Sequence, residues 1–426
     1  MFKKGIGITA IFIISNFIQL LSQIVVTRVF GATLNLDIFL AAVAIPTIIV
    51  TVIYSTLNDA FLPHYGEIKA KNPEKADRYF FSTVLVLCFL SFIISLLFSF
   101  CTDWVSAALY ASRGAEFVKN VSTQMRFMML SIPLSVISTL FGSYFYAHKQ
   151  FIRFPLAQAL GSIANIAIII ALSHTFGIWA LVIAFVVNIF FQILFVVPKS
   201  IFQLQFSVPN VFPLLLAWVP LIIGSFALRS DTLLIRSFAA HLPSGYIVYL
   251  NLVSKIFSLA TSVMTVGIQV LLLPHLVEYL SNKEIDKVIK TVNRAKIIAI
   301  SISLLVTICI TLITPLFIHL LFVGGKFSAK DAEITISLVP FFVLPAIGWG
   351  VNSVFFQPLL ALKKQLPLGI VNVGALIIGW GGGSIIKNVA GPLPGIAAGL
   401  ILLLFSGIIG SELLWQYYKN QLQKSV

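Results

Sequence analysis

The sequence predicts an all-α polytopic membrane protein of about twelve transmembrane helices, in two pseudo-symmetric six-helix lobes around a central cavity. The chain of 426 residues is 59% hydrophobic and 10% charged, with a mean hydropathy of +1.03. A soluble domain has about 25% charged residues, so this chain lacks the polar residues to cover a surface in water. Its apolar segments are long and unalternating, which indicates helices rather than barrel strands. Two motifs also recur about half a chain apart.

Twelve segments approach the roughly 20 apolar residues that one helical crossing needs. The first lobe, residues 1–205, is expected to hold Ile6–Val26, Leu34–Leu57, Tyr79–Phe100, Phe127–Ala147, Phe154–Leu172 and Ile178–Val197. The second lobe, residues 206–426, is expected to hold Val211–Ile235, Tyr246–Leu273, Ile297–Phe317, Ile336–Leu362, Leu366–Ile386 and Gly395–Trp415. No small-residue cleavage site follows the first segment, so we expect it to be retained rather than removed as a signal peptide.

The basic residues predict the orientation. Eighteen of the 28 Lys and Arg residues fall on the side of the N-terminus and seven on the opposite side. Since cytoplasmic loops carry the excess of positive charge, both termini are expected in the cytoplasm. The three remaining cations, Arg229, Arg236 and Lys255, lie inside or at the edge of predicted spans.

An internal repeat supports the two lobes. Thr27–Leu34 (TRVFGATL) resembles Ile235–Leu242 (IRSFAAHL), and Leu62–Glu67 (LPHYGE) resembles Leu273–Glu278 (LPHLVE). The copies follow corresponding segments, the first and seventh and then the second and eighth. Because six crossings separate them, the repeat is parallel, an arrangement that encloses a central cavity in transporters that alternate access.

Polar side chains recur at helical spacing along the eighth segment. They are Asn251, Ser254, Lys255, Ser258, Thr261, Ser262, Thr265 and Gln269. Shorter stripes occur in the second segment (Thr47, Thr51, Tyr54, Ser55 and Asn58) and the first (Asn16, Gln19 and Gln23). Lipid cannot satisfy such groups, so the stripes predict a water-lined cavity. The alternative is helix packing through Ser, Thr and Asn.

Charges within spans call for a partner or a function, because each costs at least ~2.5 kcal/mol. Arg229 and Arg236 are seven residues apart and would share a face of one helix. Asp231 cannot face Arg229 two residues away, so Lys255 on the next helix is its expected partner. For Arg28 and Arg236 the alternative is snorkelling to the outer interface.

A cationic, polar cavity suits a phosphate or diphosphate. The chain has no P-loop, nucleophile motif or metal-ligand spacing, which argues against an enzyme, a cofactor or a metal site. Sodium or proton coupling stays open. The basic residues are spread over loops, so nucleic acid is not an expected partner. The glycine run Gly379–Ser384 either lets its helix unwind or packs closely against a neighbour.

Four segments resemble the MurJ (MviN) branch of the multidrug/oligosaccharidyl-lipid/polysaccharide exporter superfamily, whose type member flips the peptidoglycan precursor lipid II. They are Arg28–Ala42 (RVFGATLNLDIFLAA), Asp59–Glu67 (DAFLPHYGE), Gln269–Glu278 (QVLLLPHLVE) and Gly325–Ala332 (GKFSAKDA). The resemblance spans nearly the whole chain. It implies two six-helix lobes in the bacterial inner (cytoplasmic) membrane.

The resemblance also carries over individual residues. Arg28 and Asp37 match family residues near the outer ends of the first two helices, and Lys255 stands where the family has a cavity arginine. Some positions depart from the family. Its arginines in the first two helices correspond to Asn16, Ser22, Val50 and Thr51, and the groove helices thirteen and fourteen are not found. The charges of the seventh segment are more similar to those of O-antigen and capsule-unit flippases.

We therefore predict a monomeric flippase that moves a polyprenyl-diphosphate-linked saccharide, a lipid II-like precursor or a surface-polysaccharide unit, to the outer leaflet by alternating access. Its partners are this substrate and membrane lipids. The expected substrate-binding residues are Lys255, Arg229, Arg236, Asp231, Arg28, Asp37, Asn16, Asn251, Ser258 and Ser262. One alternative is a cation-coupled multidrug exporter, which needs cavity acids such as Asp37 and Asp231. The other is a non-transporting cell-envelope scaffold, which needs no buried polar stripe.

Overall fold

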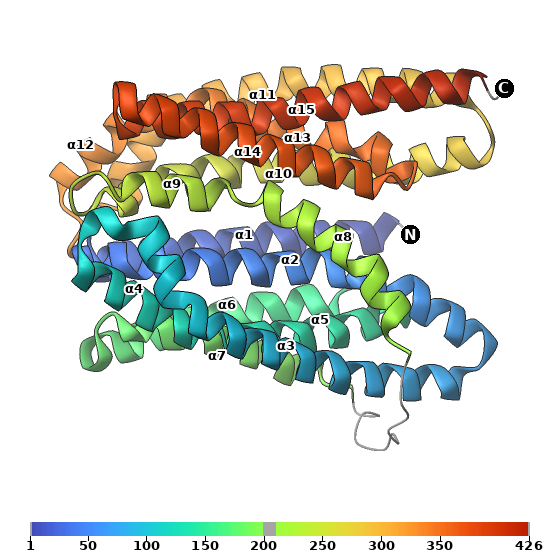
Figure 1. The fold of residues 1–426 in the computed structure, drawn as a ribbon, viewed down its shortest axis with the longest axis horizontal. Coiled ribbons are helices and arrows are strands. Elements are labelled where there is room, and N and C mark those ends of the chain that lie inside the picture. The colour runs from blue at the N-terminus through green and yellow to red at the C-terminus, as the bar shows by residue number, and fades with distance from the viewer. Residues whose placement is uncertain (1, 199–209, 425–426) are drawn as a thin grey trace. The chain divides into compact units, whose positions relative to one another are not determined.

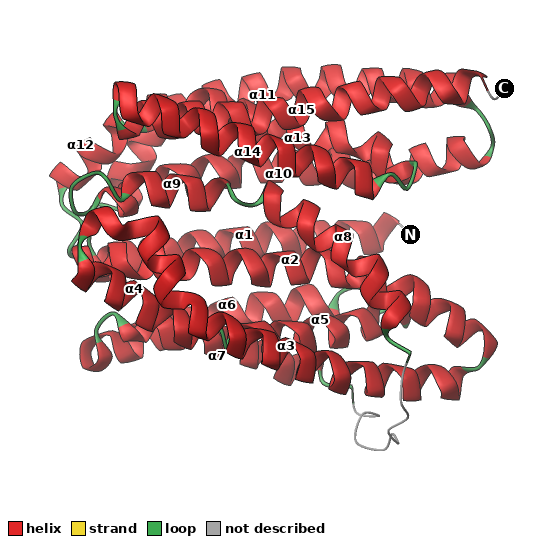
Figure 2. Ribbon diagram, in the orientation of Figure 1, coloured by secondary structure: helices red, strands yellow, loops and turns green. Residues whose placement is uncertain are grey.

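The computed structural model describes residues 2–198 and 210–424; within these ranges the side chains of residues 2–13, 262–271, 274 and 353 are not described. Its described residues form helices joined by mostly short loops (Figure 2). Contacts divide the chain into two compact units, residues 1–222 and 223–426. The lobe boundary expected at residue 205 lies outside the described residues.

The described residues of the first unit form seven α-helices and one short 3-10 helix, followed by the start of an eighth α-helix (Figure 1). They are α1 (Phe2–Phe30), α2 (Leu34–Lys71), α3 (Pro73–Tyr110), η1 (Ala111–Arg113), α4 (Ala115–Met128), α5 (Ser131–Ala147), α6 (Arg153–Phe176) and α7 (Trp179–Val196). α8 (Phe212–Leu228) follows, and the boundary between the units falls inside it.

The second unit repeats this order. It contains α9 (Asp231–Ala239), α10 (Tyr246–Ser281), α11 (Ile285–Leu321), α12 (Ala329–Ser337), η3 (Val339–Phe342), α13 (Val343–Ala361), α14 (Gln365–Ala390) and α15 (Pro392–Lys424). In the first unit α5 packs on α2, α3 and α7; in the second, α13 packs on α10, α11 and α15. The matching neighbours confirm the internal repeat.

The described helices account for twelve crossings. Nine are long and apolar enough to span a membrane, and the bent pair α8–α9 makes ten. α1 has 29 residues and α10 has 36. The parts of these two helices whose side chains are described, Ile14–Phe30 and Tyr246–Thr261, are also apolar. We call the end of each unit at which α1 begins or α15 finishes the terminal end, and the other the far end.

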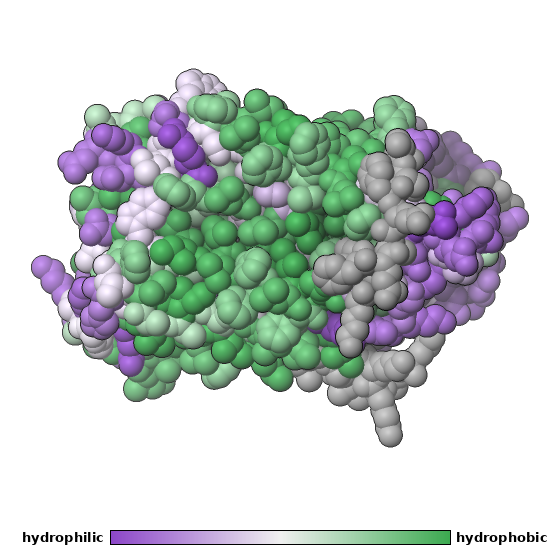
Figure 3. Space-filling model, turned by 90° about the horizontal axis from the view of Figure 1, so that it is seen from below, coloured by the Kyte–Doolittle hydropathy of each residue, from purple (hydrophilic) through white to green (hydrophobic). Residues whose placement is uncertain are grey.

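The surface of the first unit is arranged for lipid. Large apolar side chains of α3 point outward, among them Phe89, Phe92 and Leu97, whereas Ser91 and Ser95 are buried. Figure 3 shows an apolar band across the middle of the visible face and polar residues toward both ends. An apolar exterior of this kind is stable in hydrocarbon and not in water.

The predicted seventh span is broken, which corrects the expectation of one helix over Val211–Ile235. α8 ends at Leu228, α9 begins at Asp231, and the two are bent by 43°. The amide of Ser230 bonds the carbonyl of Ala227, three residues back, and the Asp231 carboxylate accepts the amide of Thr232 at 2.7 Å. A tightened last turn followed by an acidic helix start separates the two helices.

The LPHYGE motif packs the terminal end of the first unit. Tyr65 is fully buried, stacks on Phe61 at 5.3 Å and donates its hydroxyl to Asp77 at 3.1 Å. In the repeat copy, Leu276 is fully buried in a cluster with Trp415. The motif therefore marks the turn of each second helix that packs against its neighbours.

The glycine run of α14 packs closely instead of unwinding. α14 is continuous from Gln365 to Ala390. A Cβ on Gly379 would lie 2.6 Å from the Cβ of Leu403, and one on Gly383 would lie 2.8 Å from the Cα of Gly399. Such contacts allow α14 and α15 to approach backbone to backbone, as small residues do in membrane helices.

Candidate functional site

Two cations come together in the second unit, on α9 and α10. Arg236 is 7% exposed and donates from Nη2 to the Oδ1 of Asn251 at 2.8 Å. Lys255, one turn beyond Asn251 along α10, is half-buried and lies within electrostatic range of Arg236. The structure thus joins three of the predicted site residues. Because Arg236 is buried and hydrogen-bonded, the snorkelling alternative does not hold for it.

Asp231 has partners other than the expected Lys255. Its Oδ2 accepts the indole N–H of Trp349 on α13 at 2.9 Å, and its Oδ1 accepts the backbone and hydroxyl of Thr232. Arg229, two residues before it, also lies within electrostatic range. Residues two apart point away from each other only within one continuous helix, and here the break at Arg229–Ser230 interrupts the helix.

The break also separates Arg229 from Arg236. Arg229 lies in the turn between α8 and α9 and its side chain is exposed, whereas Arg236 lies in α9 and is buried. The two arginines do not share a face of one helix, which corrects the predicted pairing. The arginine that lies within electrostatic range of Lys255 is Arg236.

Asp37 lies in the interior of the first unit. It is fully buried and forms an ion pair with Arg113 of η1, with an Nη2–Oδ2 distance of 3.4 Å. The guanidinium of Arg113 also lies 5.5 Å from the ring centroid of Phe117. Arg28, which the resemblance placed nearby, is exposed. The ion pair connects the start of α2 to the α3–α4 connection.

Hydroxyl groups of the α10 stripe bond their own helix. Ser254 donates to the carbonyl of Asn251 at 3.0 Å, Ser258 to that of Lys255 at 3.1 Å and Thr261 to that of Phe257 at 3.1 Å. Such bonds satisfy hydroxyls without water. The side chain of Ser262 lies outside the described part of the chain.

The stripe of α1 is partly satisfied inside the first unit. Asn16 and Ser22 are half-buried, and the hydroxyl of Ser22 donates to the amide oxygen of Asn165 on α6 at 3.3 Å. Gln23 donates to the hydroxyl of Thr27 at 3.5 Å. Helix packing therefore explains part of this stripe.

The GKFSAKDA motif ties α12 to α10. Ser328 and Asp331 form a reciprocal capping box at the start of α12, and Tyr249 donates its hydroxyl to Asp331 at 2.5 Å. Burial alone would raise the pKa of the Asp331 carboxyl, but hydrogen bonds from Tyr249 and Ser328 hold it below its usual value. The motif thus holds the first turns of the helix that carries Asn251 and Lys255.

Sequence reasoning missed three buried or half-buried partners. Arg113 and Trp349 lie 76 and 118 residues from the aspartates that they contact. Lys296 of α11 pairs with Glu412 of α15 and lies over the rings of Phe355 and Trp415. Arg113 follows a long apolar segment and Lys296 precedes one. At such positions the charge pattern predicts only a loop or a membrane interface.

Comparison with known proteins identifies relatives of this chain. A family model described as "Lipid II flippase MurJ" matches residues 26–374. "Probable lipid II flippase MurJ" of Helicobacter pylori (strain ATCC 700392 / 26695) is 24% identical over 196 residues, which cover 46% of this chain and 39% of that protein. The protein of the same name from Borreliella burgdorferi is 25% identical over 377 residues, covering 83% and 72% of the two chains. The chain thus spans 39% of the H. pylori relative's length and 72% of the Borreliella one's.

Two solved structures share the fold. "Lipid II flippase MurJ, inward closed conformation" has a TM-score of 0.81 at 18% identity and covers 96% of this chain and 86% of that one. An inward-facing multidrug resistance MATE family transporter of the MOP superfamily has a TM-score of 0.75 at 16% identity and covers 96% of both chains. At these identities the likeness shows the fold alone.

Proposed function

Since the chain belongs to the lipid II flippase MurJ family, we propose that it flips a polyprenyl-diphosphate-linked saccharide from the cytoplasmic to the outer leaflet by alternating access. The substrate is a lipid II-like cell-wall precursor or a surface-polysaccharide unit. The protein acts as a monomeric transporter in the bacterial inner membrane, with both termini in the cytoplasm and no catalytic step.

The cation pair on α9 and α10 carries this proposal. Arg236 is buried at Asn251, and Lys255 adds a second positive charge beside it. Two like charges repel in a medium of low dielectric constant, and an anion between them relieves that repulsion. A diphosphate offers several acceptor oxygens for charge-assisted hydrogen bonds from both groups. Lys255 and Arg236 therefore hold the diphosphate, with Asn251 positioning Arg236.

The acids favour this function over a cation-coupled drug exporter. Asp37 is occupied by Arg113, and Asp231 by Trp349 and Thr232. Asp59, which α2 also contains, is 25 residues from the helix start, or about 37 Å along the axis, beyond the roughly 30 Å of a hydrocarbon core. These described carboxylates do not form an open acidic pair for a cationic drug.

The test is flipping by the full chain in proteoliposomes. A fluorescent polyprenyl-diphosphate-linked disaccharide is followed by dithionite quenching from outside. Lys255→Ala and Arg236→Gln should each lower the initial rate about tenfold or more, since a hydrogen bond to a charged group contributes about 1.5–3 kcal/mol. Lys255→Arg should retain part of the rate.

Arg126→Gln is the matched control, because Arg126 pairs with Asp103 on the exposed surface of the first unit. It should flip at the wild-type rate. A normal rate for Lys255→Ala combined with Arg236→Gln would refute the assignment of these cations to the diphosphate.

A further inference from the structure

α9, which carries Arg236, takes its orientation from its packing. It has nine residues, Asp231–Ala239, and the break at Arg229–Ser230 separates it from α8. Because α8 and α9 are bent by 43°, the axis of α8 does not continue into α9. The placement of the Arg236 guanidinium therefore depends on the side chains that pack this short helix against its neighbours.

Apolar and cationic side chains lie on opposite sides of α9. Leu234 and Phe238 are four residues apart and share one face, whereas Arg236 is two residues from each, about 200° around the helix. All three side chains are buried. α9 packs on α10 and on α15, and Arg236 donates to Asn251 of α10. The apolar face is thus left for the other side of the helix.

Two glycines make room for this apolar face. A Cβ on Gly399 of α15 would lie 3.1 Å from both Cδ1 and Cδ2 of Leu234. One on Gly383 of α14 would lie 2.9 Å from the Cε2 of Phe238. We call Leu234, Phe238, Gly383 and Gly399 the α9 seat. Because such contacts are shorter than ordinary van der Waals contacts, a methyl group at either glycine would displace the apolar face.

The ring of Phe238 is also held by side chains of α14. The ring of Trp380 packs against it at 74°, with centroids 5.7 Å apart, and the Nζ of Lys387 lies 5.1 Å from its centroid. The same Nζ lies 3.4 Å from the Nε2 of His241, which follows α9. These contacts secure the last turn of α9, so the seat fixes the rotation of the helix.

The hydrogen bond of Arg236 is sensitive to small movements of α9. Close-packed interiors transmit strain, so a displacement of about 0.5 Å at Leu234 moves Arg236, on the same short backbone, by a similar amount. A change of this size takes the 2.8 Å bond to Asn251 outside the usual range of about 2.7–3.2 Å.

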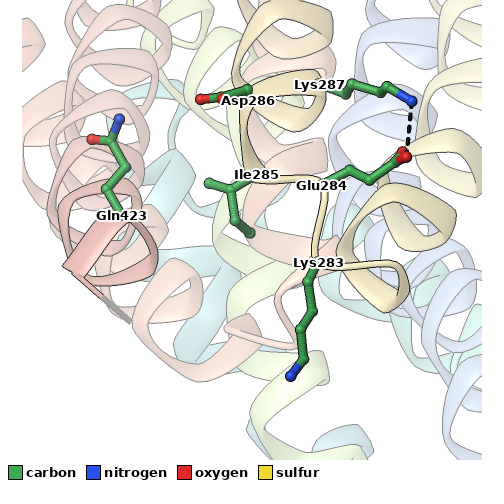
Figure 4. A pocket seen from close by; sticks show the side chains of 6 residues that line it. All are labelled: Lys283, Glu284, Ile285, Asp286, Lys287 and Gln423. Carbon is green, nitrogen blue, oxygen red and sulfur yellow. Dashed lines mark hydrogen bonds and ion pairs between the residues drawn. The ribbon is translucent and has the colours of Figure 1, made fainter. Parts of the chain in front are cut away.

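A hollow in the second unit lies far from the seat. It has a volume of about 440 Å³ at the turn between α10 and α11, where Lys287 pairs with Glu284 at 2.8 Å (Figure 4). From Asn251 to the end of α10 at Ser281 the helix extends about 45 Å. The hollow is therefore not part of the Arg236 arrangement. Its lining residues are Lys283, Glu284, Ile285, Asp286, Lys287 and Gln423.

We propose that Leu234 and Phe238 are positioning residues for substrate binding. Packed against Gly399 and Gly383, they fix the rotation of α9 and so hold the guanidinium of Arg236 in place for the diphosphate. They act through Arg236, by lowering the cost of ordering a long cationic side chain when the diphosphate binds. This inference rests on the proposed function, which assigns Arg236 to that diphosphate.

Flipping by the full chain in proteoliposomes tests the proposal. Initial rates are measured over a range of mole fractions of the fluorescent polyprenyl-diphosphate-linked disaccharide. Gly399→Ala, which crowds Leu234, should raise the apparent KM about two- to tenfold and leave the maximal rate unchanged, because it weakens binding alone. Phe238→Leu, which takes the ring out of the seat, should do the same. Arg236→Gln should raise the KM at least as much.

Gly407→Ala is the matched control on the same helix. A Cβ there would lie 3.7 Å from the Cβ of Ala375, an ordinary contact with α14. The substitution removes the same backbone freedom as Gly399→Ala and should keep the wild-type KM. Leu234→Val combined with Gly399→Ala exchanges one methylene for another, so this double variant should recover the wild-type KM.

Positioning and folding give different kinetics. A lower maximal rate of Gly399→Ala at an unchanged KM would mean only less folded protein and would overturn the proposal. So would a wild-type KM in Phe238→Leu, an equal rise in Gly407→Ala, or no recovery in the double variant, while Arg236→Gln still raises the KM. If Arg236→Gln itself leaves the KM unchanged, the proposed function fails, and this inference fails with it.

Discussion

Arg236 of α9 donates a 2.8 Å hydrogen bond to Asn251 of α10, and both side chains are buried. The bond connects a helix that follows the break in the seventh span to the helix that carries Lys255. It therefore fixes the distance between the two cations that we assign to the diphosphate.

Removing the acceptor should destabilise the second unit. Asn251→Ala leaves the buried guanidinium without this acceptor, and we expect a loss of about 1.5–3 kcal/mol. The measurement is chemical unfolding of the purified protein in detergent. Ser254→Ala is the comparison, because Ser254 bonds only its own helix, at the carbonyl of Asn251. Equal effects of the two substitutions would show that the Arg236 contact contributes nothing to stability.

The ion pair of Asp37 and Arg113 should behave as a buried pair. Asp37→Ala removes the carboxylate that pairs with Arg113, and we expect a loss of about 3–5 kcal/mol. Replacing both residues together, by Leu and Met, should restore most of it. Arg28→Gln, at an exposed position, should change stability by less than about 0.5 kcal/mol. A thermal unfolding series of wild type and these three variants decides between this prediction and a surface role for Asp37.

The Asp331 capping box should stabilise the protein down to acidic pH. Hydrogen bonds hold its folded-state pKa below the ordinary value of 3.8. The stabilisation is therefore fully present above the unfolded pKa and is lost as pH falls through the lower folded one. The unfolding temperatures of wild type and Asp331→Ala should differ equally at about pH 8 and pH 5, and the difference should shrink below about pH 4. A difference that shrinks already near pH 6 contradicts this assignment.

The membrane potential should be able to drive flipping. A diphosphate carries roughly two negative charges, and each gains about 2.3 kcal/mol on moving outward across 100 mV, inside negative. If cavity cations neutralise the substrate, the same energy acts on the return of the empty carrier. Flipping in liposomes with valinomycin-clamped potentials and no sodium or proton gradient should respond to the imposed potential. Flipping that follows only a sodium or pH gradient would overturn this mechanism.

Much of the architecture could be predicted from the order of residues. Each membrane crossing can be predicted from its own apolar segment, because hydrocarbon thickness sets the length of a helix whatever its neighbours are. The repeat could be predicted from the TRVFGATL and LPHYGE motifs and their copies, because they lie at the same turns of corresponding helices. Lys255 and Arg236 were identifiable because a charge beside an apolar segment is rare in any context.

The sequence by itself thus determined the crossings, the two units and the cations, while the tertiary structure decided which charges meet. Asp37 contacts Arg113 across 76 residues, and Asp231 contacts Trp349 across 118. Such pairs depend on the rotation and tilt of packed helices, which polar periodicity leaves open. The break at Arg229–Ser230 depends on the same packing: α9 contacts α10 and α15, and its 43° bend moves Arg236 off the face of Arg229.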